Sequence, residues 1–275
     1  MKHKLIVALC GLLMTASLAS AQAPRFRWQT GQVLVYRSEH NTLASYIKDD
    51  SKSETKTRVQ SIKRWQVLAV DEAGVATLRM SLQALFFETV PPVGEPLVFD
   101  SANLDKSDKA LRAQYENLIG QPLVEVRVDA LGKVVEVKEA KPGYSAAKYE
   151  SDPPFKFLLP VETLKADLAW ERDYQIALEP PQGTGEKYAA VQRYVCKGVA
   201  DNLATVALTT EVKNAPAAQE DQVPLWQVQP DGEIVFDVQA GRLQKATMRI
   251  DKEAKIEGGS TRFQSVYTEE YAGDR

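Results

Sequence analysis

A strict two-residue alternation between apolar and charged side chains is the feature that most constrains the fold of this chain. In Val124–Val128 three valines alternate with charged residues. Successive side chains of a strand point to opposite faces, so the pattern is typical of a strand with one buried and one solvated face. Gly132 lies where a tight turn needs a positive φ, and a β-branched return strand follows over Val134–Lys138. Residues 124–140 therefore predict a β-hairpin.

A weaker version of this hairpin returns at residues 232–251. Gly241 marks its turn, and the apolar positions on one face are Ile234, Phe236, Val238, Ala246, Met248 and Ile250. An internal duplication would explain the recurrence. An ordinary antiparallel sheet would also explain it, because such sheets consist of one-sided hairpins. The sequence leaves both interpretations open.

Further strands are expected along most of the chain. The segments with strand-like composition are Arg25–Arg37, Thr57–Val70, Val75–Leu85, Lys187–Lys197, Leu203–Val212, Leu225–Val228, Arg242–Asp251 and Thr261–Tyr271. Residues 38–56 are polar and mixed in charge. They predict either a long solvated loop or the outward-facing ends of two long strands.

One segment has the spacing of a helix. Residues 104–119 carry apolar side chains at helical intervals, and Gly120 followed by Pro122 indicates the end of the helix. We expect this helix to pack across the sheet or to cover its open end.

A proline-rich segment divides the chain into two strand-rich parts. Residues 142–160 contain four prolines and a glycine, a composition typical of a connector. The expected organisation is a leader over residues 1–21, an N-terminal half with the helix over 22–141, the connector over 142–160 and a C-terminal half over 161–275.

The first residues resemble a secretory signal peptide. Lys2 and Lys4 precede an apolar run from Leu5 to Met14, and Ala19–Ala21 fits a cleavage site with small residues. The apolar run is shorter than the roughly 20 residues that a membrane-spanning helix needs, and no later run is longer. The prediction is an exported protein of the periplasm or the extracellular space without a transmembrane segment.

Charge and cysteine content narrow the classes of partner. The formal net charge is −3, and without a basic block the chain is not expected to bind nucleic acid. Cys10 belongs to the leader, so Cys196 would be alone in the exported chain and could form no internal disulfide. Cys196 lies in an apolar stretch, which favours a buried, inert thiol over an exposed thiol that pairs two chains.

The residues that most catalytic and metal sites need are scarce. Beyond the leader the chain has one histidine, His40, in a polar segment without a nucleophile motif. Ser-His-Asp and Cys-His sites need a histidine beside the nucleophile, and zinc needs three or four ligands. We therefore expect no metal and no cofactor, and we interpret His40 as an exposed loop residue. A hydrolase that uses two carboxylates stays open, because acidic residues are plentiful.

Aromatic residues recur in the expected strands and the helix. They fill the core in one interpretation, and in another they line a concave groove for a lipid-like ligand. The groove candidates are Trp65, Phe86, Phe87, Tyr115 and Trp226.

Several short motifs together resemble an uncharacterised family of secreted bacterial envelope proteins. They are the leader, Gly31 and Tyr36 in G-x-x-x-x-Y, LIGQP at 118–122, the hairpin of 124–137 and the Leu-Pro step at 159–160. The family has no assigned activity. The strand-rich order with a helix midway also resembles the lipoprotein-carrier (LolA-like) fold, a bent half-barrel plugged by helices.

The expected fold class is α+β and mostly antiparallel β, with a curved sheet or half-barrel and one main helix on the concave face. A repeat of two similar halves is one of the open alternatives. The expected function is that of a non-enzymatic envelope protein that binds an apolar ligand or a protein partner. The alternative is a structural or assembly module of the envelope without a small-molecule ligand. The oligomeric state does not follow from the sequence.

Overall fold

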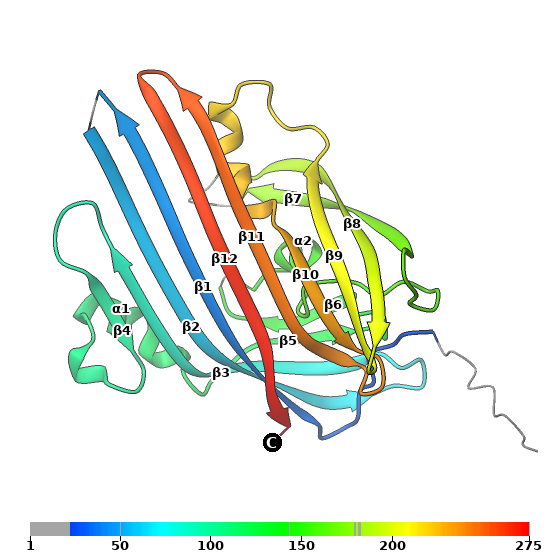
Figure 1. Cartoon of the computed structure of the whole chain (residues 1–275). Helices are drawn as coiled ribbons and strands as arrows, with labels where there is room; N and C mark the ends of the chain where they lie inside the picture. Colours follow the sequence, from blue (N-terminus) through cyan, green and yellow to red (C-terminus); the bar gives the residue numbers. More distant parts are fainter. Residues whose placement is uncertain (1–22, 50, 143, 179, 181–182, 275) are drawn as a thin grey trace, which may run out of the picture.

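Twelve strands form one antiparallel, strongly curved sheet (Figure 1). The structure is a computed structural model that describes residues 23–49, 51–142, 144–178, 180 and 183–274. The expected leader over residues 1–21 lies outside the described residues. The curved, mostly antiparallel sheet confirms the expected fold class.

The strands alternate with few helices. The strands are β1 (Val33–Lys48), β2 (Ser51–Val70), β3 (Ala76–Val90), β4 (Leu97–Asp100), β5 (Pro122–Val128), β6 (Val134–Ala140), β7 (Ala169–Leu178), β8 (Glu186–Ala200), β9 (Leu203–Val212), β10 (Asp231–Asp237), β11 (Arg242–Ile256) and β12 (Gly259–Asp274). The α-helices are α1 (Lys109–Tyr115) and α2 (Ala146–Ser151), and the 3₁₀ helices are η1 (Leu104–Lys106), η2 (Glu116–Leu118) and η3 (Glu220–Val228). Among the described residues, the helices are all too short or too polar to cross a bilayer.

The first and last strands meet in the middle of the sheet. The spatial order is β6-β5-β3-β2-β1-β12-β11-β10-β9-β8-β7, and β4 adds to β3 beside this path. The ladder between β1 and β12 runs from Leu34↔Asp274 to Lys48↔Gly259. Strands β1–β6, from the expected N-terminal half, therefore form one wing of the sheet, and strands β7–β12, from the expected C-terminal half, form the other.

The pleat of the predicted hairpins is confirmed. Val124, Val126 and Val128 are buried while the residues between them are partly exposed. Gly132 has φ +91° in the turn to β6. In the second hairpin the predicted face is also buried, from Ile234 on β10 to Ile250 on β11, except that Val238 in the turn is only partly buried. The apolar residues of the period-two alternation therefore form the buried inner face of the sheet in both hairpins.

The proline-rich segment lies in the core. Phe155 and Phe157 are almost completely buried, and the ring of Phe155 lies 5.5 Å from the ring of Trp65. Helix α2 packs on β7 and touches β6, so the segment joins the two edge strands of the sheet. The concave face is thus filled by the part of the chain that connects its two wings.

The main helix is shorter than expected and lies at the β3/β4 end of the concave face. The Asp108 carboxylate caps α1 by accepting from the backbone N–H groups of Ala110 and Leu111 at 2.9 and 3.2 Å. The ring of Tyr115 lies 5.6 Å from Phe87 and 5.5 Å from Phe99. Gly120 follows with φ +75°, as a helix end requires.

The structure decides two further predictions, one for residues 38–56 and one for Leu225–Val228. Residues 38–56 are the ends of two long strands, which pair to Lys48↔Ser51, and the loop alternative is wrong. The strand expected at Leu225–Val228 is also wrong, because these residues belong to η3. Pro224 within η3 has no N–H to donate to a ladder, and the apolar side chains of Leu225 and Trp226 are buried beneath the turn.

Candidate ligand-binding cavity

A cavity of about 360 Å³ lies between the concave face of the sheet, the segment around α2 and the end of η3. Its apolar wall comes mainly from β9, β11 and η3, and its polar wall comes mainly from β1, β12 and the α2 segment. The apolar residues are Leu208, Val228, Pro230, Met248 and Ile250, and the charged or titratable residues are His40, Lys148, Asp152, Lys156 and Tyr267. The cavity thus has two chemically distinct sides.

Strand register places the two sides next to each other. Tyr267 on β12 is paired with His40 on β1 and with Met248 on β11, so one row of the sheet runs from polar to apolar. In the neighbouring row Ser265 is opposite Ile250. Since paired residues share a face, the ladder itself builds the transition from a polar to an apolar surface.

His40 is an inner-face residue of β1, so its interpretation as an exposed loop residue is wrong. A 2.7 Å hydrogen bond joins its Nε2 to the Ser265 hydroxyl, and its ring meets the Tyr267 ring edge-on at 5.8 Å. Burial lowers the pKa of His40, and the charge of Lys156 lowers it further against the opposing effect of Asp152. The neutral imidazole is therefore favoured here.

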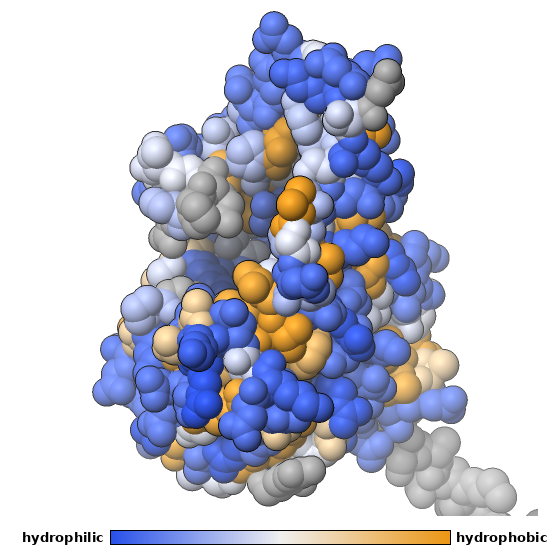
Figure 2. All heavy atoms as spheres, turned by 90° about the vertical axis from the view of Figure 1, so that its left-hand side faces the viewer, coloured by the Kyte–Doolittle hydropathy of each residue, from blue (hydrophilic) through white to orange (hydrophobic). Residues whose placement is uncertain are grey.

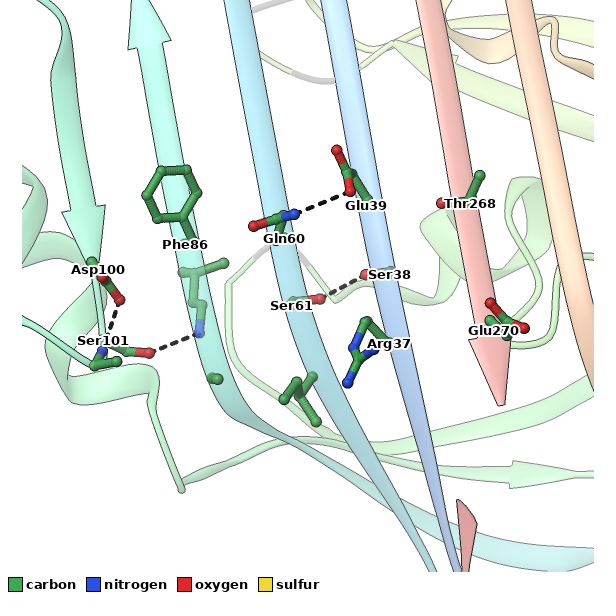
Figure 3. A pocket seen from close by; sticks show the side chains of 14 residues that line it. Arg37, Ser38, Glu39, Gln60, Ser61, Phe86, Asp100, Ser101, Thr268 and Glu270 are labelled. Carbon is green, nitrogen blue, oxygen red and sulfur yellow. Dashed lines mark hydrogen bonds between the residues drawn. The ribbon is translucent and has the colours of Figure 1, made fainter. Parts of the chain in front are cut away.

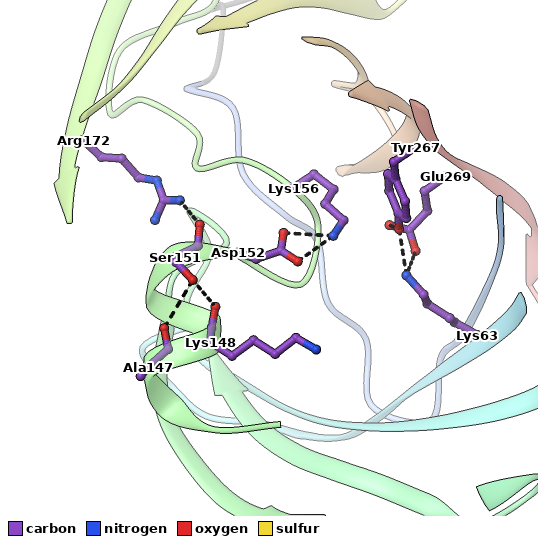
Figure 4. Close-up of polar contacts among 9 residues, drawn as sticks. All are labelled: Lys63, Ala147, Lys148, Ser151, Asp152, Lys156, Arg172, Tyr267 and Glu269. Carbon is purple, nitrogen blue, oxygen red and sulfur yellow. Dashed lines mark hydrogen bonds and ion pairs between the residues drawn. The ribbon is translucent and has the colours of Figure 1, made fainter. Parts of the chain in front are cut away.

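A hydrogen-bonded network lies at the polar end, next to the cavity (Figure 4). The Lys63 ammonium donates to Tyr267 Oη at 2.8 Å and to Glu269 Oε1 at 2.9 Å, and Tyr267 Oη donates to Glu269 Oε2 at 2.8 Å. The side chain of Glu269 is 1% exposed. Burial, followed by the neighbouring Glu269 charge, raises the pKa of Tyr267 well above its ordinary range. The phenol is thus fixed as a neutral donor.

A second ion pair faces the cavity from the α2 segment. Lys156 Nζ lies 2.9 Å from both carboxylate oxygens of Asp152 and 4.6 Å from the centre of the Tyr267 ring. Burial disfavours both charges, but the ion pair outweighs it, so the pKa of Asp152 is lowered and that of Lys156 is raised. The Asp152 side chain keeps 49% of its accessible surface, which forms part of the cavity wall.

The backbone is strained at Lys156, the residue whose ammonium group faces the cavity. Lys156 has φ +70°, a left-handed conformation that costs a residue with a Cβ about 1–2 kcal/mol. Its neighbours Phe155 and Phe157 are anchored in the core. Strain of this kind persists where the surroundings fix it and is common at functional sites.

Lys148 on α2 is the second lysine that lines the cavity, besides Lys156. Its ammonium lies 4.9 Å from the centre of the Tyr144 ring, and among the described residues no carboxylate is within ion-pair distance of it. Figure 4 shows its side chain extended beside Asp152 without a bond to it. Burial lowers the pKa of Lys148, and the charges of Lys156 and Lys63 lower it further while Asp152 opposes them.

The edge strand β7 fixes the position of α2. The guanidinium of Arg172 donates to the backbone carbonyls of Glu150 and Ser151 at 2.7 and 2.9 Å. At the other end of α2 the Ser145 hydroxyl accepts from the backbone N–H of Lys148 at 3.1 Å. These contacts cap both ends of a helix of six residues and hold Lys148 and Asp152 against the cavity.

The five aromatic groove candidates lie elsewhere. Trp65 is buried against Phe155, Trp226 is buried in η3, and Tyr115 at the end of α1 packs against Phe87. Phe86 lines a more open hollow of about 560 Å³ that also includes Arg37 and Glu39 (Figure 3). Arg37 and Glu39 alternate with the inner-face residues of β1, so this hollow is on the opposite face. The structure brings together Phe87 and Tyr115 and separates the other candidates.

The outer surface is mostly polar but not uniformly so. Viewed from the side of α1 and β4, apolar atoms gather in a central patch surrounded by hydrophilic residues (Figure 2). In the region between β3 and the end of β4, Val93 is 88% exposed and Leu97 is 41% exposed. Among the described residues, no group of three or more His, Cys, Asp or Glu side chains is placed to hold a metal ion.

Comparisons with known proteins show a likeness of fold. No family model and no curated protein matches the chain. The chain matches an outer membrane channel from Pseudomonas putida F1 at a TM-score of 0.31 and 8% identity. The match covers 90% of this chain and 97% of the channel chain. It also matches an outer membrane lipoprotein-sorting protein domain from Vibrio parahaemolyticus at a TM-score of 0.15 and 10% identity. This match covers 87% of this chain and 84% of the domain.

A lipovitellin structure, described as showing lipid–protein interactions, matches at a TM-score of 0.50 and 14% identity. The match covers 90% of this chain and 26% of the lipovitellin chain. The chain is therefore similar in fold to a part of lipovitellin that makes up about a quarter of that protein.

Proposed function

We propose that the protein is an exported, non-enzymatic envelope protein that binds a lipid-like ligand in the cavity of its concave face. The observation that carries the proposal is the apolar wall of Leu208, Met248 and Ile250 opposite a set of polar groups. A volume of about 360 Å³ is in the range of small-molecule sites, which are mostly apolar with a few polar groups.

The fold likeness supports the same proposal. The matched lipovitellin structure concerns lipid–protein interactions, and a curved sheet with an apolar inner face is suited to such a ligand. The ion pair with Lys156 outweighs burial and lowers the pKa of Asp152, so this carboxylate is unsuited to act as a general acid, which needs a raised pKa.

Two tryptophan substitutions on one strand test the proposal. Ile250 lines the cavity, and Arg249 beside it is exposed on the other face of β11. We expect Ile250→Trp to weaken binding of the neutral fluorescent probe N-phenylnaphthylamine by roughly tenfold or more, because the indole occupies the cavity. Arg249→Trp should leave the affinity unchanged. Equal affinities of the two variants would contradict the proposal.

An assembly module of the envelope is the second candidate function. The apolar patch of Figure 2 favours it, and so does the exposure of Val93 and Leu97 around the β3–β4 connection, since exposed apolar surface marks interaction sites. Native mass spectrometry after purification from the envelope distinguishes the two. A bound apolar molecule near one-to-one supports the cavity, and a ligand-free protein that captures a partner supports the module.

A further inference from the structure

The charges around the cavity do not cancel. Lys63 is paired with Glu269 and Lys156 with Asp152, each at 2.9 Å. Lys148 has no such carboxylate among the described residues. Three ammonium groups therefore face two carboxylates, and the one without a counterion is at the cavity wall.

Lys148 is an exposed residue of α2, and its side chain borders the cavity without a carboxylate partner among the described residues. An anion bound beside it replaces water as the partner of the ammonium group, and the neighbouring apolar wall strengthens the attraction between the opposite charges. Asp152 does not meet this need, since both of its oxygens are bonded to Lys156. The position beside Lys148 thus favours an anion that comes from outside the chain.

The apolar wall restricts what that anion can be attached to. Met248 and Ile250 on β11 and Leu208 on β9 form a continuous apolar surface that borders the polar wall. A ligand with a charge near Lys148 and a hydrocarbon chain along this wall satisfies both sides. A volume near 360 Å³ is at the low end of the range for ligand sites, which suits one chain better than two.

We propose that the ligand is a single-chain amphiphile with an anionic head group, and that Lys148, assisted by Lys156, binds this head group. The inference rests on the proposed lipid-binding function and specifies its ligand class. The carboxylate of a free fatty acid and the phosphate of a lysolipid both meet the description. His40 and Tyr267 border the head-group position, and the Tyr267 hydroxyl is already bonded to Lys63 and Glu269.

Displacement of N-phenylnaphthylamine at pH 7 tests the proposal with three competitors of matched chain, namely oleate, oleyl phosphate and oleyl alcohol. We expect at least one of the two anions to bind the unmodified protein roughly tenfold or more tightly than the alcohol, which corresponds to about 1.4 kcal/mol. Whichever anion is preferred identifies the head-group chemistry. Inorganic phosphate should displace nothing, and displacement by it would show a site for free anions and overturn the inference.

Variants of Lys148 separate charge from packing. Lys148→Gln should bring the affinities for the anion and the alcohol close together, mainly by weakening the anion, and Lys148→Arg should keep the preference. Lys165→Gln, an exposed position between the connector and β7, is the matched control and should behave like the unmodified protein. A preference that persists in Lys148→Gln would overturn the inference.

The outcomes for the two proposals differ. If anion and alcohol bind the unmodified protein equally well, the head-group inference fails and lipid binding stands. If neither competitor nor probe binds, while circular dichroism shows a folded protein, the proposed function fails and the inference fails with it.

Discussion

Lys63 on β2 and Glu269 on β12 form an ion pair of 2.9 Å across β1, the strand that separates them in the sheet. The two side chains are 21% and 1% exposed. Removing one member of a buried pair leaves the other charge without compensation. We expect Glu269→Gln to lower the free energy of unfolding by about 3 kcal/mol, measured by urea denaturation.

The double variant Lys63→Met/Glu269→Leu tests the cause of this loss. It removes both charges, so it should be closer in stability to the unmodified protein than Glu269→Gln is. A double variant that loses the sum of the two single losses would show that the charges do not interact.

The stability should depend on pH through His40. The pKa of His40 is lowered in the folded protein from its ordinary value of 6.5, first by burial and then by Lys156 and Lys63, with Asp152 opposing them. The unfolded chain therefore binds the proton more readily, and the free energy of unfolding should fall as pH falls through about 6.5 towards the lowered pKa. Urea denaturation between about pH 5 and 7 measures this slope.

His40→Gln keeps a polar side chain at this position and removes the titration. Its unfolding free energy should be flatter over the same pH interval. The pKa of Asp152 is lowered from 3.8, so the stability that Asp152 contributes is lost only at more acidic pH and does not interfere. An unchanged slope in His40→Gln would assign the pH dependence to other groups.

Two glycines with similar backbone angles separate strain from crowding. Gly132 has φ +91°, and a Cβ there would lie 2.6 Å from a ring carbon of Phe26; Gly74 has φ +79° with nothing within 4 Å. Gly74→Ala should cost about 1–2 kcal/mol for the left-handed backbone alone. Gly132→Ala should cost about 1–3 kcal/mol more, because Phe26 must move within the core. Equal losses in thermal or urea denaturation would show that Phe26 adapts freely.

The thiol of Cys196 should be inert in the native protein. The side chain is fully buried, and burial raises its pKa. In protein without residues 1–21 we expect its reaction with Ellman's reagent to be slower on the order of 100-fold or more than in urea. Rapid labelling under native conditions would mean that β8 opens readily, and Cys196→Ser serves as the blank.

The two-residue alternation allowed the sheet to be predicted from the sequence, because an inner face of valine, isoleucine and leucine is easy to recognise. The same rule failed on β1 beyond Tyr36. There the inner-face residues are polar, since Ser38 shares a buried 2.7 Å hydrogen bond with Ser61 and His40 lines the cavity. A polar inner face removes the contrast on which the rule depends, so one of the two interpretations of residues 38–56 is a solvated loop.

The cavity itself depends on contacts that sequence patterns do not encode. Lys148, Asp152 and Lys156 come from a segment whose prolines suggested a connector, yet Pro153 and Pro154 are buried. The signal that was present is the pair Phe155 and Phe157, two large apolar residues that a solvated linker would not contain. The position of the Asp152–Lys156 ion pair beside Tyr267 follows from tertiary packing alone.

The junction of β1 and β12 also affects how the sheet assembles. Each wing grows mainly by pairing strands that are near neighbours in the chain, whereas this central ladder joins residues as distant as Leu34 and Asp274. Closing so large a loop has the highest entropic cost in the sheet and slows folding. We therefore expect the two wings to form first and the ladder between β1 and β12 to form last. The polar network of Lys63, Tyr267 and Glu269, which bridges that junction, would then form only when folding is complete.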